Sequence, residues 1–160
     1  MKNQDVDQKT NHPEQDGSLG SSLRPLVYSQ LMDVRFSDLD PYGHVSTGRY
    51  LDIVIASRYI FFANYFKTPI DELAKNDLGF YTSRLEEVNF LRSITGVHQV
   101  LVESYSTILE PGRHRVTFTI KSVSDSKVFV QGSYIDHPVK LSTKKPQPLP
   151  PWAHKYIFEE

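Results

Sequence analysis

The sequence of 160 residues contains no cysteine, and this absence excludes several kinds of site at once. Disulfide bonds, zinc sites with thiolate ligands, iron–sulfur clusters and cysteine nucleophiles all require that residue. A surplus of charge of one sign is also missing, because 18 Lys and Arg face 19 Asp and Glu, for a formal net charge of −1. A chain without a basic surplus lacks the usual means of holding phosphates, so we expect no nucleic-acid partner.

Long apolar runs are absent as well. Charged residues interrupt each run before it reaches the roughly 20 residues that a membrane span needs, so we expect no span. Residues 1–24 contain no aromatic residue and no apolar segment typical of a secretory signal. We expect 1–24 to be a disordered N-terminal tail and the protein to be cytoplasmic. The remaining length fits one domain at 25–142, followed by a Pro-rich C-terminal strap at 143–160.

Aromatic residues, by contrast, make up 12% of the chain, and many of them lie between residues 50 and 66. This stretch is apolar at most positions and is too long for one strand. We predict a helix over 50–66 that the rest of the domain encloses, because the helix is apolar on nearly every side. Pro69 ends this helix and begins a short second one over 69–76.

Alternating patterns dominate outside these helices. Strands are predicted over 26–36, 80–91, 97–109, 113–123 and 127–135. The last three are joined by short turns, and short turns join antiparallel neighbours. One sheet must then curl around one apolar helix. The pattern therefore predicts an α+β protein with the hotdog fold, an antiparallel β-sheet wrapped around one long central helix.

The proline-rich residues 144–151 predict an extended segment, since each proline disfavours a helix before it. Such a segment is a possible ligand for a proline-binding domain. We favour packing on its own domain, because Trp152, Tyr156, Ile157 and Phe158 follow it and can anchor it.

A polar segment over 35–50 joins the first strand to the long helix. A structural connector explains its residue types, because Asp and Pro favour turns, Gly43 permits a positive φ, and Ser or Thr can cap the helix. Asp38, Asp40 and His44 are possible ligands for a hard metal, although two carboxylates and one imidazole form an incomplete set. A carboxylate at the helix entrance can also act as a base or nucleophile, since the helix dipole stabilises its ionised form.

The segment also resembles a family signature. From Arg35 to Tyr50 it reads R-F-x-D-x-D-x-x-G-H-V-x-x-x-x-Y. This is similar to the R-x-x-D-x-D-x-x-G-H-V-N-N-x-x-Y pattern of the 4-hydroxybenzoyl-CoA thioesterase-like branch of the hotdog superfamily. The likeness extends from about Tyr28 to Ile135 and includes a Pro-Leu-Pro segment at Leu149. It implies an acyl-CoA or acyl-carrier-protein thioesterase that uses no metal and no cofactor beyond the CoA or pantetheine of its substrate.

The resemblance also implies roles for individual residues. The family's catalytic carboxylate falls on Asp40, which would direct a water as general base or attack the thioester itself. His44 matches a histidine that assists the carboxylate in acyl-carrier-protein thioesterases, or else it orients the loop, while Asp38 caps the turn or pairs with Arg35. Backbone donors for the oxyanion are expected near the loop and, from a neighbouring subunit, at the start of a strand: Gly43, Val45, Gly79, Phe80 and Tyr81.

The chain departs from the family pattern at two places. Ser46-Thr47 stands where many relatives have Asn-Asn, and Tyr42 replaces an Asn of acyl-carrier-protein thioesterases. We expect supporting roles for Tyr42, Ser46, Thr47 and Tyr50. The departures make a changed substrate or lost activity credible, so the alternative is a non-catalytic hotdog protein that binds acyl groups or lipids or serves in assembly. A hotdog dehydratase or hydratase is disfavoured, since that branch places its Asp/His pair differently.

Oligomerisation and CoA binding are further expectations. Family members form homodimers or homotetramers with sites between subunits, and pairing would also cover the sheet edges that one chain leaves open. Arginines that could contact CoA phosphates are Arg84, Arg92, Arg113 and Arg115. The remaining histidines form no pattern: His12, His98, His114, His137 and His154.

Overall fold

A curled antiparallel sheet and one long helix form the centre of the molecule. The computed structural model describes residues 24–65 and 70–159. In chain order its elements are β1 (Tyr28–Asp33), the short 3₁₀ helix η1 (Phe36–Asp38), α1 (Arg49–Tyr65), α2 (Ile70–Lys75), β2 (Leu78–Phe90), β3 (Gln99–Glu110), β4 (Arg113–Ser122), β5 (Val128–Lys140), β6 (Lys145–Pro146) and the 3₁₀ helix η2 (Pro151–Tyr156). Of the predicted tail only Arg24 is described, and the predicted end of the long helix at 67–69 also lies outside the described residues.

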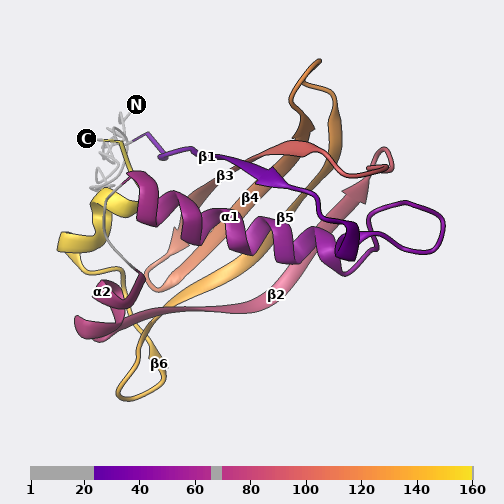
Figure 1. Cartoon of the computed structure of the whole chain (residues 1–160). Coiled ribbons are helices and arrows are strands. Elements are labelled where there is room, and N and C mark those ends of the chain that lie inside the picture. The colour runs from indigo at the N-terminus through magenta and orange to yellow at the C-terminus, as the bar shows by residue number, and fades with distance from the viewer. Residues whose placement is uncertain (1–23, 66–69, 160) are drawn as a thin grey trace, which may run out of the picture.

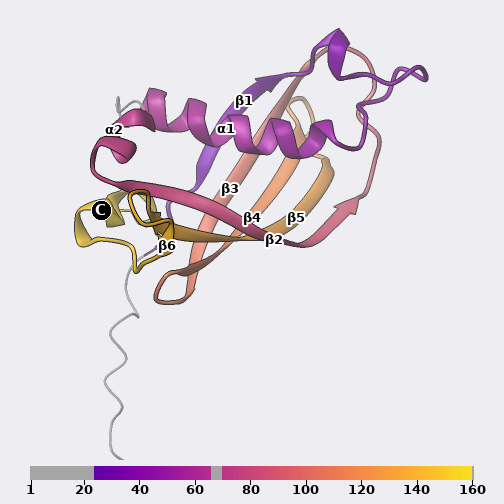
Figure 2. The same cartoon turned by 90° about the horizontal axis from the view of Figure 1, so that it is seen from below.

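The strands are ordered β1-β3-β4-β5-β2, with β6 paired to the end of β5. Every pairing is antiparallel. Helix α1 crosses one face of this sheet, which curls beneath it (Figures 1 and 2). The predicted α+β hotdog architecture is therefore confirmed.

Alternation along β4 shows why this sheet has one apolar face. Val116, Phe118 and Ile120 are buried, while the intervening Arg115 is exposed and Thr117 is half-buried. Side chains alternate between the two faces of a strand, so the buried set faces α1. One core cluster lies under the first half of α1 and contains Tyr50, Ile53 and Val54 packed with strand residues of β3, β4 and β5.

A second core cluster lies at the C-terminal half of α1. Phe61 and Phe62 meet Tyr28 of β1 there, together with Tyr156 and Ile157 from the end of the chain. The last described residues continue along the start of β1, since the Leu26 amide donates to the Ile157 carbonyl over 2.7 Å. The C-terminal segment thus packs on the domain, but it is not wholly extended, because it turns into η2 after Pro150.

The structure differs from the sequence prediction in two ways that concern α1 and β5. The domain does not enclose α1 on every side, because Tyr59 and Ile60 are 53% and 39% exposed. A single sheet covers one side of a helix, and the opposite side stays open. Strand β5 runs on to Lys140, past the predicted end at Ile135, because the polar Asp136 and His137 belong to the strand.

Candidate active site

Residues 39–45 form a tight hairpin before α1. The Asp40 amide donates to the His44 carbonyl over 2.7 Å, and the Gly43 amide donates to the Asp40 carbonyl over 3.0 Å. Leu39 and Val45 pair across the base of the hairpin. Gly43 has a φ of +77°, a conformation that residues with a Cβ rarely adopt, so glycine suits the turn.

The Asp40 carboxylate has two unlike oxygens. Oδ1 accepts the backbone N–H groups of Tyr42 at 2.8 Å and of His44 at 3.0 Å. Oδ2 has no hydrogen-bond partner among residues 24–65 and 70–159. Asp40 is therefore held by loop amides and not by the first amides of α1, and it keeps one oxygen free for other chemistry.

Asp38 has a structural position. Its Oδ2 accepts the backbone N–H of Arg35 at 2.8 Å, and its Oδ1 lies 3.8 Å from Nε of Arg49. The backbone carbonyl of Asp38 accepts both the amide and the hydroxyl of Ser46. The Ser46 hydroxyl therefore ties two parts of the loop together and does not cap the helix.

Asp40 lines a cleft of about 340 Å³ at the N-terminal end of α1. The cleft is formed by the loop, the first turn of the helix and the chain that follows β2. The residues that line it are Asp40, His44, Val45, Thr47, Tyr50, Phe90, Leu91, Arg92 and Ser93. The structure thus brings together Asp40 and four more of the predicted site residues (His44, Val45, Thr47 and Tyr50), as well as Arg92.

The supporting residues differ in exposure. Tyr50 is buried, its ring packs edge-on against Phe90, and its hydroxyl accepts the Ile94 amide at 3.4 Å. Tyr42 is 85% exposed, so only its backbone takes part in the site. The His44 ring is exposed, and the bond of this residue to Asp40 runs through its amide.

Amides of the loop are mostly engaged. The Gly43 amide donates to Asp40, and the Val45 amide donates to the Ile94 carbonyl over 2.9 Å, so neither is free for an oxyanion while these bonds persist. The amides of Thr47 and Gly48 have no acceptor in the described part of the chain. Such unpaired donors are expected at the start of a helix. Sequence reasoning missed this pair, which the position of the helix start could have indicated.

Gly79, Phe80 and Tyr81 lie at the opposite end of β2 from Phe90. A strand rises about 3.3 Å per residue, so Gly79 is roughly 35 Å from Phe90 along β2. Within one chain these three residues do not reach the Asp40 cleft. Phe80 instead faces α1, and Tyr81 lines a separate pocket on the other face of the sheet with Ser83 and His137.

Of the four candidate arginines, one lies at the Asp40 cleft. Arg92 lines it and donates to the Val128 carbonyl over 3.2 Å. Arg84 and Arg115 both pair with Glu86. Their hydrogen bonds lower the Glu86 pKa to about 2, and the bond from Arg115 has the largest effect. The fourth, Arg113, pairs with Glu110 beside the β3–β4 turn.

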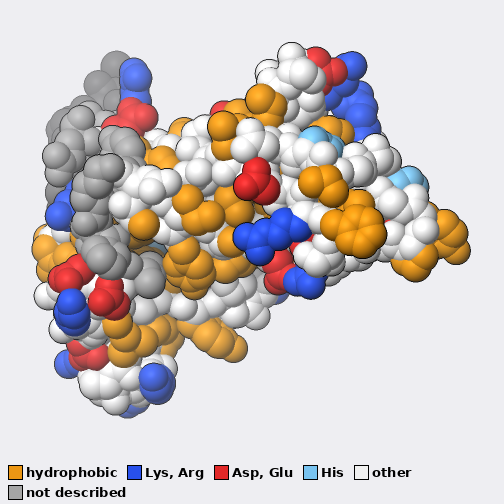
Figure 3. All heavy atoms as spheres, in the orientation of Figure 1, with side chains coloured by type: hydrophobic (Ala, Val, Ile, Leu, Met, Phe, Trp, Pro, Cys, Tyr) orange, Lys and Arg blue, Asp and Glu red, His pale blue; other side chains and the backbone are white. Residues whose placement is uncertain are grey.

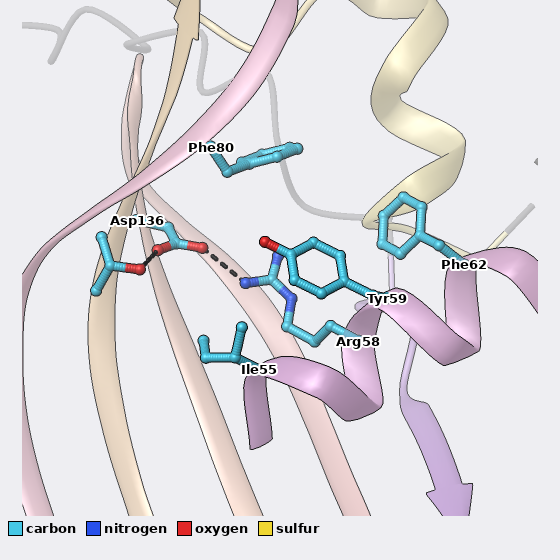
Figure 4. Close-up of a pocket in the computed structure, with 7 residues that line it drawn as sticks. Ile55, Arg58, Tyr59, Phe62, Phe80 and Asp136 are labelled. Carbon is cyan, nitrogen blue, oxygen red and sulfur yellow. Dashed lines mark hydrogen bonds and ion pairs between the residues drawn. The ribbon is translucent and has the colours of Figure 1, made fainter. Parts of the chain in front are cut away.

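A second pocket, of about 230 Å³, lies between the C-terminal half of α1 and β2. Arg58 of α1 and Asp136 of β5 form a buried ion pair in it, at 2.7 Å (Figure 4). The Arg58 guanidinium lies over the rings of Tyr28, Phe80 and Tyr134, 5.9 Å from each ring centre. In the sequence, Arg58 stood out only as an interruption of an apolar helix, and Asp136 did not stand out at all.

The electrostatics of this pair favour the charged state. Burial lowers the Arg58 pKa, but Tyr134, Asp136 and Tyr28 raise it by more, so the pKa lies above its ordinary value. Burial also raises the pKa of Tyr28 to about 12, although the charge of Arg58 acts against this. Arg58 therefore stays a cation and Tyr28 stays neutral throughout the usual pH range.

Clusters of metal-ligating side chains and helices of membrane-spanning length are both absent from the described residues. These residues contain no group of three or more His, Cys, Asp or Glu side chains arranged to hold a metal ion. None of their helices is long and apolar enough to cross a bilayer.

Several solved structures similar to this one are described as thioesterases. A thioesterase of Thermus thermophilus, solved with coenzyme A and zinc, aligns over 81% of this chain and 90% of its own, with 28% identity and a TM-score of 0.62. The 1,4-dihydroxy-2-naphthoyl-CoA thioesterase Slr0204 of Synechocystis aligns over 81% and 94%, with 14% identity and a TM-score of 0.70. The DHNA-CoA thioesterase of Staphylococcus aureus aligns over 81% and 87%, with 19% identity and a TM-score of 0.69.

No curated protein sequence matches the chain significantly. A family model does match, and it is described as the thioesterase-like superfamily and covers residues 34–157. This range includes the Asp40 loop, all of α1, and the strands from β2 to β6. The chain therefore belongs to the thioesterase-like superfamily and has the hotdog fold of its structural relatives.

Proposed function

We propose that this protein hydrolyses a thioester of coenzyme A or of an acyl carrier protein, with Asp40 as the catalytic carboxylate. The observation that carries the proposal is the free Oδ2 of Asp40. Asp40 lines a cleft, and two backbone amides fix its other oxygen, Oδ1. A fixed carboxylate with one free oxygen can act on a bound thioester without reorganising. Family membership and the thioesterase neighbours support this reaction class.

Two routes are compatible with this geometry. As a general base, Oδ2 takes a proton from water while the water oxygen attacks the carbonyl carbon. The carbon–sulfur bond then breaks, and the thiolate leaves and is protonated. As a nucleophile, Oδ2 attacks the carbonyl carbon itself, the carbon–sulfur bond breaks and the thiolate leaves and is protonated, and water then hydrolyses the anhydride that has formed. Both routes consume one water and release one acid and one thiol.

The oxyanion that forms in either route needs aligned donors. We assign this role to the amides of Thr47 and Gly48, because Thr47 lines the cleft and both amides lack an acceptor in the described chain. They precede the first turn of α1, where the positive end of the helix dipole also favours an anion. Arg92 lines the same cleft and is positioned to contact a phosphate of CoA. His44 orients the loop through its amide, and its exposed ring is available to assist Asp40.

Asp40→Asn tests the assignment with little disturbance to the loop. Asparagine keeps an oxygen that accepts from Tyr42 and His44, but it cannot act as a base. We expect the release of free thiol from a panel of acyl-CoAs to fall by about 10²- to 10⁴-fold. Asp52→Asn is the matched control, since Asp52 is exposed and pairs with Arg49, and its turnover should stay near that of the wild type.

Two results would count against the proposal. Unchanged turnover in Asp40→Asn would remove Asp40 from the mechanism. Binding of acyl-CoA by the wild type without release of thiol, over all chain lengths and with an acyl carrier protein, would favour the non-catalytic acyl-binding alternative.

A further inference from the structure

The pocket between α1 and β2 combines apolar walls with one buried ion pair. It is lined by Ile55, Arg58, Tyr59, Phe62, Phe80, Thr82 and Asp136. Figure 4 shows the Arg58 and Asp136 side chains meeting inside it, among Ile55, Tyr59, Phe62 and Phe80. The cavity of about 230 Å³ is of the size that a short chain of carbon atoms can occupy.

Both oxygens of the Asp136 carboxylate already accept a hydrogen bond from within the chain. Its Oδ2 accepts Nη1 of Arg58 at 2.7 Å, and its Oδ1 accepts the Thr82 hydroxyl at 2.6 Å. Its side chain is only 2% exposed. Arg58 is different, because Nη1 also donates to the Tyr134 hydroxyl at 2.8 Å while Nε and Nη2 have no partner within the described residues.

Stability alone does not account for such a pair. A buried ion pair costs desolvation, and a well-packed apolar pair of similar volume is often as stable or more so. The pair stands between the two core clusters, where apolar residues would continue the packing. The Nε and Nη2 groups of Arg58 are not among the fully buried polar atoms that lack a partner, so an acceptor that enters the pocket can reach them. The pocket therefore offers N–H donors to an oxygen.

The charges of Arg58 and Asp136 determine which kind of oxygen-bearing group the pocket can bind. Asp136 already neutralises Arg58, so a second carboxylate would add an uncompensated negative charge to a largely apolar space. A neutral acceptor such as a hydroxyl, keto or ether oxygen satisfies the free N–H groups without that cost. The aromatic and aliphatic walls suit the hydrocarbon that carries the oxygen.

The position of the pocket connects it to the Asp40 cleft. Tyr50 and Phe90 line the cleft, and the pocket lies farther along the same two elements, α1 and β2. The helical rise of about 1.5 Å per residue places Arg58 about 12 Å beyond Tyr50. An acyl chain that starts from a thioester at Asp40 and follows α1 reaches Arg58 with its distal part.

We propose that this pocket binds the distal part of the acyl group and that Arg58 selects acyl chains carrying a neutral oxygen there. The inference rests on the proposed function, because it takes the ligand to be the acyl group of a thioester substrate. It assigns a specificity-determining role to Arg58 and names the substrate class as oxygenated acyl thioesters of medium length.

The test measures binding and needs no turnover. The probes are S-alkyl-CoA thioethers, which cannot be hydrolysed, in matched pairs with and without a hydroxyl on the distal part of the chain. We expect the wild type to bind the hydroxylated thioether about tenfold more tightly by calorimetry. Arg58→Lys keeps the positive charge opposite Asp136 but loses the planar set of donors, so it should remove this preference and leave the Kd of the plain thioether unchanged.

Matched variants keep the result interpretable. Arg24→Lys changes an exposed arginine outside the pocket and should keep the wild-type preference. If Arg58→Lys does not fold, Ile55→Trp fills the pocket while keeping both residues of the ion pair, and it should weaken binding of both thioethers at least tenfold.

Four outcomes overturn the proposal: equal Kd values for the pair in the wild type, a preference that survives Arg58→Lys, unchanged binding in Ile55→Trp, or tighter binding of a matched thioether ending in a carboxylate. Each is independent of Asp40→Asn, which judges hydrolysis by itself. A wild type that hydrolyses thioesters but shows no preference keeps the proposed function and loses this inference.

Discussion

His114 is a buried ionisable residue to which the proposed chemistry gives no role. It lies on β4 opposite Asp136 of β5, is 1% exposed, and its Nε2 has no hydrogen-bond partner within the described residues. Burial lowers its pKa to about 4, and the charge of Asp136, which acts in the other direction, does not compensate. Arg58, His137 and His154 lower it further. The imidazole is therefore neutral in the folded protein at neutral pH.

This neutral imidazole predicts acid sensitivity. An unfolded histidine binds its proton near pH 6.5, whereas His114 in the folded state does so near pH 4. Between these values the unfolded state holds more protons, so the free energy of unfolding falls as the pH falls from 6.5 to 4. The loss attributable to His114 amounts to roughly 2–3 kcal/mol.

His114→Gln should flatten this dependence, and urea unfolding at several pH values measures it. The control His98→Gln removes an exposed imidazole and reports any effect of losing a histidine as such. A His114→Gln curve parallel to that of the wild type between pH 6.5 and 4 would contradict the prediction.

Sequence reasoning found residues of the site where they are close in the chain. The loop motif from Arg35 to Tyr50 is contiguous, so its spacing alone is enough to indicate a site. Arg58 and Asp136 lie far apart in the chain and meet only because β5 passes beneath α1. A polar residue within an apolar helix pattern carries no information about its partner, so this pair could not be predicted.

At the scale of elements, Gly132 shows how closely β5 packs between its neighbours. It is paired with Phe118 of β4 on one side and with Val88 of β2 on the other. A Cβ at this position would lie 2.4 Å from the Glu87 carbonyl oxygen and 2.8 Å from Cζ of Phe118. One of these contacts involves backbone, which cannot rotate away.

Gly132→Ala should therefore destabilise the protein, by roughly 1–3 kcal/mol, because it overpacks a tight contact. Chemical denaturation measures the change. Gly48→Ala is the matched control, since nothing lies within 4 Å of a Cβ built there, and it should change stability by about 0.5 kcal/mol or less. Equal stability of the two variants would show that β2 and β5 are free to separate at this point.

The elements themselves were largely predictable, because alternation and helical spacing are local properties. The predicted ends of the helix over 50–66 lie within two residues of the observed ends. The same holds for four of the five strands, except at the end of β5. The first predicted strand, 26–36, is shortened to Tyr28–Asp33, since η1 follows once Asp38 binds the Arg35 amide. The end of β5 and the helical turn η2 escaped prediction, because both depend on contacts with distant parts of the chain.

At the scale of the whole molecule, the open side of α1 and the edge strand β2 present apolar side chains together. Tyr59 and Ile60 are exposed on α1, and Leu85 and Phe90 are exposed on β2. Figure 3 shows hydrophobic side chains spread over the face that α1 crosses. An exposed apolar surface beside a free strand edge is typical of a protein interface.

We expect this surface to join two copies of the chain, so that the protein sediments as a homo-oligomer. Leu85→Lys places a charge on the β2 edge and should weaken self-association at least tenfold, as measured by analytical ultracentrifugation over a range of concentrations. Leu109→Lys is the control, because Leu109 is 39% exposed at the far end of β3 and should not affect assembly. A monomeric wild type, or equal effects of the two variants, would contradict the prediction.

The two oxygens of the Asp40 carboxylate differ in their hydrogen bonds, and this difference has a consequence for evolution. One oxygen builds the hairpin and the other is free, so under the proposed function the same residue serves both the folding of the loop and catalysis. A descendant that lost turnover would still gain from an acceptor at position 40, and its signature would persist long after its activity. In this chain the motif thus indicates how the loop is built, whereas the residues around the free oxygen bear on whether a reaction takes place there.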